Sequence, residues 1–136
     1  MRDQEPTDSS TNTDTGVWYE GGCHCGAVRF RVRLYNNRAL ACNCSICAKK
    51  GFINLIATED DFDLLKGADV LSTYQFNTKV ARHQFCSNCG VHTHTRPRSH
   101  PEGYDVNARC LDAGSDFLDI TPFDGQNWES SVESIR

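Results

Sequence analysis

The stretch Cys42-Asn43-Cys44-Ser45-Ile46-Cys47 places three thiols within six residues. Two outlying pairs, Cys23/Cys25 and Cys86/Cys89, also have the spacing of metal ligands, so seven of the eight cysteines fit such a pattern. Four sulfurs can close a structural zinc site, whereas three protein ligands leave a position for water or substrate. The spacing therefore predicts two zinc ions, one structural and one catalytic.

Disulfide bonds are the alternative for these cysteines. Residues 1 to 20 contain no apolar segment typical of an export signal, so we expect an intracellular, cytoplasmic protein. In a reducing compartment, this many cysteines indicates metal binding or catalysis. Cys23 and Cys25 would also point to opposite faces of an extended strand and pair poorly with each other. Metal binding is the favoured interpretation.

The chain of 136 residues predicts one folded domain. The first sixteen residues contain no apolar residue beyond Met1, which predicts a disordered tail over residues 1–16. We expect a zinc-binding domain over 17–125 and a C-terminal tail over 126–136. Small domains have modest cores and commonly use metals to gain stability.

Charge and hydropathy exclude two classes of partner. The 14 basic and 18 acidic residues give a net charge of −4, which argues against a general nucleic-acid-binding protein. No run approaches the about 18 apolar residues that a membrane-spanning helix requires. We therefore expect a soluble protein that binds neither nucleic acid nor membranes.

Alternating apolar residues predict a mainly β fold. Val28, Phe30, Val32 and Leu34 alternate with arginines, the pattern of a strand with one core face and one charged face. Residues 58–67 begin with a potential capping Thr and end at Lys-Gly, which predicts one or two helical turns. The Cys44 to Cys47 spacing predicts a tight turn. Further strands are expected at 17–20, 39–41, 52–57, 70–76, 81–85, 91–95 and 104–111, paired mainly antiparallel.

The second site has several candidate neighbours. Cys110, or one of His92 and His94, could supply a fourth ligand and close the site, which is the alternative to an open catalytic zinc. The strand at 91–95 would place His92, His94 and Arg96 on one face. Four cations are candidates for offsetting the thiolate charge and binding substrate carboxylates, with solvated surface charge as the alternative: Lys49, Lys50, Arg96 and Arg98.

The chemistry of a zinc with three thiolates follows from its ligands. Such a zinc is electron-rich and therefore well matched to a soft sulfur ligand. It would hold an incoming thiol as a thiolate at neutral pH and keep it nucleophilic. The residue pattern therefore indicates thiol chemistry at Cys42, Cys44 and Cys47.

Three motifs in this order carry a resemblance to a known family: Gly21-Gly22-Cys23-His24-Cys25-Gly26, Cys42-x-Cys44-x-x-Cys47 and Phe85-Cys86-x-x-Cys89-Gly90. They resemble the glutathione-dependent formaldehyde-activating enzyme family over about residues 17 to 125. The stretches 76–78, 89–91, 97–99 and 110–112 look more like the centromere protein V branch of that family.

The resemblance implies a fold, a metal content and an activity. The fold would be an antiparallel β-tent zinc fold, with a structural zinc at Cys23, Cys25, Cys86 and Cys89 and a catalytic zinc at Cys42, Cys44 and Cys47. The activity would be addition of glutathione to formaldehyde, giving S-(hydroxymethyl)glutathione, which is a carbon-sulfur lyase reaction in reverse. The alternative is a non-catalytic zinc module for protein-protein interaction, similar to centromere protein V.

Overall fold

The structure is a computed structural model that describes residues 15–76, 81–97 and 102–127. Several sequence-based predictions lie outside the described residues. They are residues 1–14 of the N-terminal tail, Arg98 and residues 128–136 of the C-terminal tail.

The described residues form ten strands, one short α-helix and several 3-10 turns, so the mainly β prediction is confirmed. The helix is α1 (Ser45–Lys50), and the 3-10 turns are Glu59–Asp61, Ala68–Val70, Ala108–Cys110 and Gly125–Asn127. The strands are β1 (Val17–Gly22), β2 (Arg29–Leu34), β3 (Arg38–Cys42), β4 (Ile53–Ala57), β5 (Phe62–Lys66), β6 (Leu71–Tyr74), β7 (Arg82–Cys86), β8 (His92–Arg96), β9 (Tyr104–Asn107) and β10 (Asp119–Phe123).

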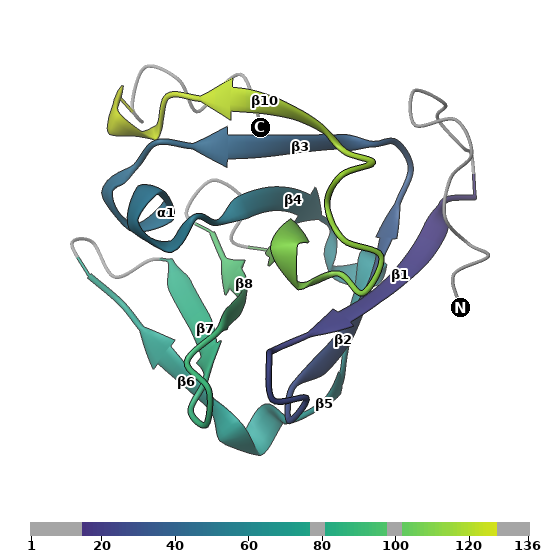
Figure 1. The fold of residues 1–136 in the computed structure, drawn as a ribbon, viewed down its shortest axis with the longest axis vertical. Helices are drawn as coiled ribbons and strands as arrows, with labels where there is room; N and C mark the ends of the chain where they lie inside the picture. The colour runs from purple at the N-terminus through teal and green to yellow at the C-terminus, as the bar shows by residue number, and fades with distance from the viewer. Residues whose placement is uncertain (1–14, 77–80, 98–101, 128–136) are drawn as a thin grey trace.

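These strands make two sheets that face each other (Figure 1). The smaller sheet has three antiparallel strands in the order β1-β2-β5. The larger sheet has seven strands in the order β10-β3-β4-β9-β8-β7-β6. An isolated bridge between Gly21 and Leu111 ties β1 to the segment that follows β9. The helix α1 lies where β3 leads into β4, at one end of the larger sheet (Figure 1).

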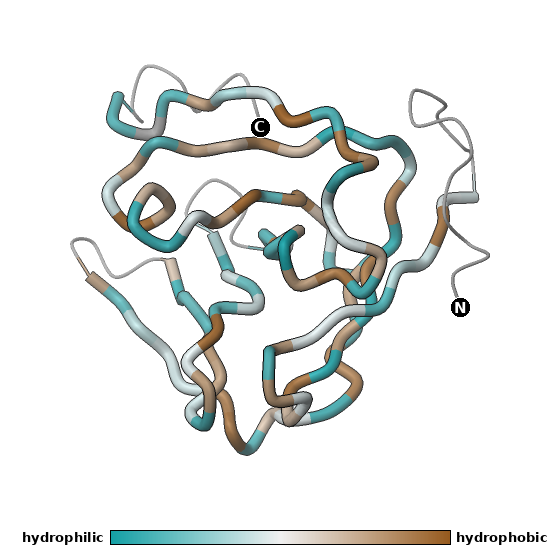
Figure 2. The backbone as a smooth tube through the Cα atoms, in the orientation of Figure 1, coloured by the Kyte–Doolittle hydropathy of each residue, from teal (hydrophilic) through white to brown (hydrophobic). Residues whose placement is uncertain are grey.

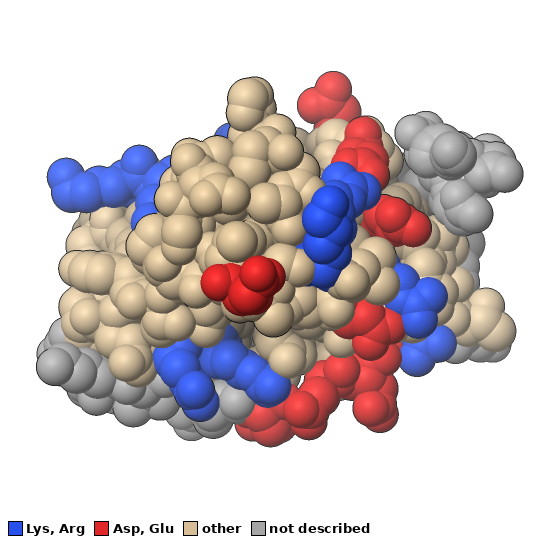
Figure 3. All heavy atoms as spheres, turned by 90° about the horizontal axis from the view of Figure 1, so that it is seen from below, with Lys and Arg blue, Asp and Glu red and all other residues tan. Residues whose placement is uncertain are grey.

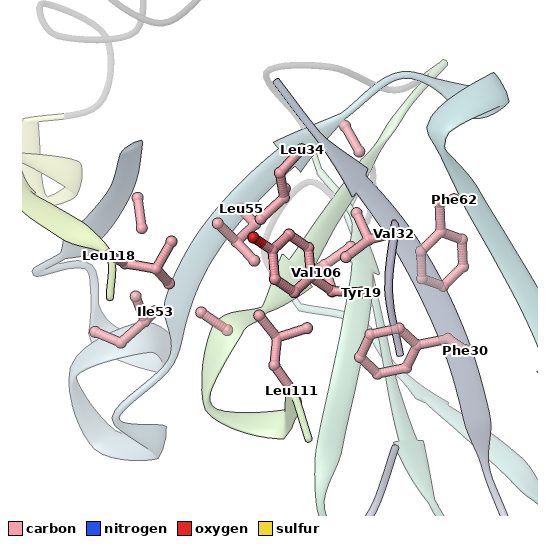
Figure 4. Close-up of a cluster of buried hydrophobic side chains, with 13 residues drawn as sticks. Tyr19, Phe30, Val32, Leu34, Ile53, Leu55, Phe62, Val106, Leu111 and Leu118 are labelled. Carbon is pink, nitrogen blue, oxygen red and sulfur yellow. The ribbon is translucent and has the colours of Figure 1, made fainter. Parts of the chain in front are cut away.

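The alternating sequence of β2 fixes the orientation of this strand. Phe30 and Val32 are 0% exposed, while Arg31 and Arg33 point outward and pair with aspartates. Figure 2 shows alternation of this kind along the strands as short brown and teal segments. The core lies between the sheets, because apolar residues from both meet there (Figure 4): Tyr19, Phe30, Val32 and Leu34 from one sheet and Ile53, Leu55 and Val106 from the other.

The predicted helical segment at 58–67 is largely wrong. Only Glu59–Asp61 is helical, as one 3-10 turn, and residues Phe62–Lys66 form the strand β5. Phe62 is buried in the core, and Asp63 lies opposite Arg31 and accepts a hydrogen bond of 2.7 Å from its Nε. Pairing with the edge of β2 therefore outweighs the local helix signals.

The structure differs from the sequence-based prediction at two places near the end of the chain. The predicted strand at 104–111 stops at Asn107, whose Oδ1 accepts from the N–H of Arg109 and starts a 3-10 turn that contains Cys110. The strand β10 was not predicted, and it pairs in parallel with β3, so the larger sheet is not wholly antiparallel. Four of its five residues are exposed, which explains the absence of a clear sequence pattern.

None of the helices in the described parts of the chain has the length and apolar character of a membrane-spanning segment. On the face of the molecule drawn in Figure 3, basic and acidic side chains lie next to one another and form no continuous basic surface.

Candidate metal centres

Four cysteines from distant parts of the chain meet in one cluster. The Sγ atoms of Cys23, Cys25, Cys86 and Cys89 all lie within 4.8 Å of one another. The Cys23–Cys25 and Cys25–Cys86 sulfur distances are 3.6 Å and 3.7 Å. A tetrahedral zinc with Zn–S bonds of about 2.3 Å requires sulfurs about 3.8 Å apart. The four thiols therefore fit such an ion.

Two similar turns present these sulfurs. Each turn ends at a glycine with positive φ, Gly26 at 83° and Gly90 at 80°, a conformation that glycine adopts without steric cost. The N–H of Gly26 donates to Cys23 O, and the N–H of Gly90 donates to Cys86 O. Backbone N–H groups of Val28 and Asn88 point at the sulfurs of Cys23 and Cys86, each at 3.3 Å. Such donors favour the thiolate, the form that binds metal.

The thiols of the four-cysteine cluster differ in pKa. Burial opposes ionisation of Cys89, but the N–H groups of Val91 and Cys25 lower the pKa of this thiol to about 6. The N–H of Ala27 acts in the same direction on Cys25, yet desolvation and the neighbouring sulfurs raise the pKa of Cys25 to about 11. A cation bound among these sulfurs would offset the charge that opposes ionisation of Cys25.

The second cluster contains the three remaining thiols of the sequence motif. The Sγ atoms of Cys42, Cys44 and Cys47 lie within 4.8 Å of one another, and all three side chains are partly exposed. Cys42 ends β3, Cys44 is the N-cap residue of α1, and Cys47 lies in the first turn of this helix. The predicted tight turn is therefore a short helix, in which Cys44 Sγ accepts from the N–H of Cys47 at 3.5 Å.

The three sulfurs of this cluster shift one another's pKa in opposite directions. Hydrogen bonds from Cys42 and then Cys47 lower the pKa of Cys44 to about 2. Its charge in turn raises the pKa of Cys42 to about 11, and the pKa of Cys47 rises strongly, first through Cys42 and then through Cys44. Full ionisation of all three requires a cation, as expected for a metal-binding donor set.

The three-cysteine cluster has no fourth cysteine or histidine among the residues that the structure describes. Cys110 lies elsewhere, with its Sγ 3.7 Å from His92 O as a weak donor. The Nε2 atom of His92 lies 3.0 Å from His94 O, and the ring of His94 packs on Phe62. The structure therefore does not show the closed alternative considered from the sequence.

The two histidines of β8 contact different parts of the molecule, contrary to the prediction that they share a face. The register slips beside Phe85, which pairs with His92 while Gln84 pairs with His94, so Thr93 is an extra residue. His92 packs on Phe52 at 4.4 Å, on the side of α1, whereas His94 packs in the core. A β-bulge thus reverses the expected alternation of side chains.

The candidate cations differ in their contacts. Lys50, at the end of α1, places its Nζ 3.3 Å from Nδ1 of His92. The guanidinium of Arg96 stacks on Tyr104 at 4.0 Å and contacts Glu59 Oε2 at 3.4 Å. Lys49 and Lys50 are both exposed residues at the end of α1. Burial lowers the pKa of Lys50, and the negative charge of Cys47 acts in the opposite direction.

A contact that the sequence did not predict holds the three-cysteine segment in place. Asn43, between two of the cysteines, donates its backbone N–H to Phe123 O and accepts at Oδ1 from the N–H of Gln126 at 2.9 Å. Its Nδ2 donates to Asp124 Oδ1. The end of β10 and the residues that follow it therefore fix the loop that carries the thiols. An Asn between two cysteines was the one local signal, but its side-chain partners are 81 and 83 residues away in the chain.

The sequence matches the family model described as glutathione-dependent formaldehyde-activating enzyme over residues 18–128. The chain belongs to this family. The matched region contains all eight cysteines, and hence both clusters. The prediction made from the three cysteine motifs is therefore confirmed at the level of the family.

Two relatives illustrate the similarity. One is a protein of Halomonas elongata named "putative glutathione-dependent formaldehyde-activating enzyme", which is 39% identical over 52% of this chain and 50% of its own length. The chain thus spans about half the length of this relative. The other is the crystal structure of a Rhodobacter sphaeroides protein, 40% identical, with a TM-score of 0.68 over 75% of this chain and 99% of that chain.

Proposed function

We propose that this protein adds a thiol, glutathione, to a small aldehyde such as formaldehyde, or catalyses the reverse cleavage. The product of the addition is S-(hydroxymethyl)glutathione, so the cleavage direction is a carbon-sulfur lyase reaction. The observation that carries the proposal is the pair of unequal clusters, one with four cysteines and one with three. A set of three protein ligands is the form typical of a catalytic zinc.

Each cluster has its own role in this proposal. Cys23, Cys25, Cys86 and Cys89 bind a structural zinc that joins the β1–β2 connection to the β7–β8 turn. Cys42, Cys44 and Cys47 hold the catalytic zinc, which when bound keeps a substrate thiol ionised and nucleophilic at neutral pH. The partly exposed positions of these three side chains are consistent with access for a substrate.

The chain's own residues set the charge and orientation around the substrate. Three thiolates carry more negative charge than one dication offsets, so a nearby cation stabilises a further sulfur ligand. Lys50 is the candidate supported by geometry, because its Nζ is held beside α1 by His92. Lys49, Arg96 and Arg98 remain proposals for binding the carboxylates of glutathione. Arg96 already contacts Tyr104 and Glu59, which favours the lysines of α1.

The family supports this choice of substrates. Its description names glutathione and formaldehyde, and the Halomonas elongata relative carries the same terms in its name. The reducing cytoplasm, where we place the protein, keeps both the cysteine ligands and a thiol substrate reduced. A non-catalytic zinc module is the outcome to be expected if the reaction test below fails.

Exchange NMR of glutathione mixed with formaldehyde tests the proposal. The zinc-loaded protein is compared with Cys44→Ser, and Cys110→Ser serves as the matched control because Cys110 belongs to neither cluster. We expect the wild-type protein and Cys110→Ser to accelerate the exchange above the uncatalysed rate, and Cys44→Ser to lose the acceleration while circular dichroism shows a folded domain. Equal rates with and without wild-type protein would exclude the formaldehyde reaction.

A further inference from the structure

Lys50 and His92 contact each other beside the three-cysteine cluster. Lys50 is the last residue of α1, one turn after Cys47, and its Nζ lies 3.3 Å from Nδ1 of His92. His92 belongs to β8, on the opposite side of this contact. Residues 42 positions apart in the chain therefore fix the end of the helix that carries a thiol.

The hydrogen bonds of His92 determine which ring nitrogen carries the proton. Its Nε2 lies 3.0 Å from His94 O, and a carbonyl oxygen can only accept. Nε2 is therefore protonated, and the neutral ring presents a lone pair at Nδ1. Lys50 must be the donor in the contact with Nδ1, because an ammonium has no acceptor.

The ring of His92 is held tightly in this state. It is 7% exposed, and it packs on Phe52 at 4.4 Å and edge-on against His83 at 5.5 Å. Its Nε2 also lies 2.6 Å from Oγ1 of Thr95, which in turn lies 3.3 Å from Nδ1 of His83. Burial, followed by the charges of Lys50 and His83, lowers the pKa of His92 to about 3. The ring therefore stays neutral at physiological pH.

The surroundings of the Lys50 ammonium act on its pKa. Partial burial lowers its pKa, while the negative charge of the Cys47 sulfur acts in the opposite direction. Its Nζ also lies 5.8 Å from the ring of Phe85, so one side of the ammonium faces apolar surface. A lysine with these neighbours gives up a proton more readily than a fully hydrated lysine.

We propose that Lys50 is the proton donor of the addition reaction, and that His92 is the positioning residue that aims it at the substrate. This inference rests on the proposed function. As the carbon-sulfur bond forms, the carbonyl π bond breaks and its electron pair moves to oxygen, which takes a proton from Lys50. The neutral amine then accepts the proton that the next thiol releases on ionisation, so protons balance over one turnover.

In the cleavage direction the same groups act in reverse. The neutral Lys50 amine takes the hydroxyl proton of the hydroxymethyl group as the carbon-sulfur bond breaks and formaldehyde leaves. In both directions of the reaction, Nδ1 of His92 accepts a hydrogen bond from Lys50 and keeps it in place, and His92 itself exchanges no proton.

The activity test compares substitutions of Lys50 in the zinc-loaded, full-length protein. Lys50→Met is expected to reduce the catalysed exchange rate about 100-fold, the lower range for general acid catalysis. Lys50→Arg retains the charge but donates its proton poorly, so it is also expected to be slow. Lys66→Met, an exposed lysine of β5, is the control. A Lys50→Met protein as fast as the wild type, or full activity of Lys50→Arg, would overturn the role of Lys50 as proton donor.

A second readout is independent of turnover. In protein labelled with ¹⁵N-histidine, the Nδ1 resonance of His92 should shift towards that of an unbonded nitrogen in Lys50→Met, while the Nε2 resonance stays that of a protonated nitrogen. An Nδ1 resonance that does not change, or a protonated Nδ1 in the wild type, would overturn the positioning contact.

Substitution of His92 separates positioning from folding. Gln at this position can still donate towards His94 O but offers no acceptor at the place of Nδ1. We expect His92→Gln to lower the maximal rate about tenfold or more with an unchanged KM for glutathione, and with normal zinc content. A changed KM with an unchanged maximal rate would overturn the positioning role. If the wild type itself gives no acceleration, the proposed function fails, and this inference fails with it.

Discussion

The Sγ atoms of Cys25 and Cys86 lie 3.7 Å apart, although the two residues are 61 positions apart in the chain. The contact joins the turn between β1 and β2 to the turn between β7 and β8, and these turns belong to different sheets. A metal at this cluster would therefore link the two sheets at a place where the buried apolar residues are Cys23, Val28 and Cys86, with partly buried side chains packed against them.

Removal of one of these ligands should unfold the domain. The free energy of metal binding at a structural site is also free energy of folding, so we expect Cys86→Ser to lower the stability by several kcal/mol and to lose zinc. Thermal unfolding followed by circular dichroism, together with zinc analysis, checks this result. Cys110→Ser is the matched control. A Cys86→Ser protein with wild-type stability would show that the four-cysteine cluster has no structural role.

The hydrogen bonds of Asn43 with residues after β10 should strengthen metal binding at the three-cysteine cluster. Asn43→Ala removes the acceptor for Gln126 N and the donor to Asp124, and each such hydrogen bond contributes about 1 kcal/mol. We expect about tenfold weaker metal binding at the three-cysteine cluster, measured by competition with a chelator. Asn36→Ala, which removes a similar hydrogen bond to Arg38 N in a distant turn, should leave this affinity unchanged.

Asp61 should make stability depend on pH in the acid range. Burial opposes its ionisation, but Arg33, Tyr35 and Thr58 donate hydrogen bonds that hold its pKa below the usual value. The stabilisation is therefore present above the unfolded pKa of about 3.9 and is lost as the pH falls through the lower, folded value.

Urea unfolding of Asp61→Asn measures this effect. At pH 7 the variant should be less stable than the wild type by about 1 kcal/mol, because the pair with Arg33 is partly exposed to solvent. The difference should narrow as the pH falls below about 4. Asp69→Asn, at an exposed position, should unfold like the wild type at both pH values. A difference that grows in acid would contradict the assignment.

Alanine substitution at two glycines with positive φ distinguishes the cost of backbone strain from the cost of a steric clash. At Gly67 (φ 98°) an added Cβ would lie 2.3 Å from Ala27 O, whereas at Gly114 (φ 80°) it meets nothing within 4 Å. Gly114→Ala should cost about 1 to 2 kcal/mol from the left-handed backbone alone. Gly67→Ala should cost clearly more, measured by urea unfolding. Equal losses would mean that β5 and the residues after Cys25 can move apart freely.

The sequence predicted those strands whose residues alternate between core and solvent. The β2 strand was predicted because Phe30 and Val32 face the core and its arginines face outward. The β10 strand was not predicted, because its exposed residues carry no such pattern and its partner, β3, is distant in the chain. Local signals also failed at Phe62, where burial against the neighbouring sheet decides between helix and strand.

The two groups of cysteines were predictable, but their surroundings were not. Cysteine spacing predicted the two groups, because metal ligands must converge whatever lies between them. The separation of His92 from His94 depends on the bulge at Thr93, which moves side chains without a sequence signal. The contact of Lys50 with His92 depends on the end of a six-residue helix that was predicted as a tight turn.

The most direct test of the central claim is ¹¹³Cd NMR of the cadmium-loaded protein titrated with glutathione. Two resonances are expected, one from each cluster. Glutathione should shift the resonance that Cys44→Ser abolishes, since a fourth sulfur joins the three cysteines, and should leave the other in place. If neither resonance moves at saturating glutathione, the three-cysteine cluster does not bind the substrate thiol, and the account of a thiol-activating centre is contradicted.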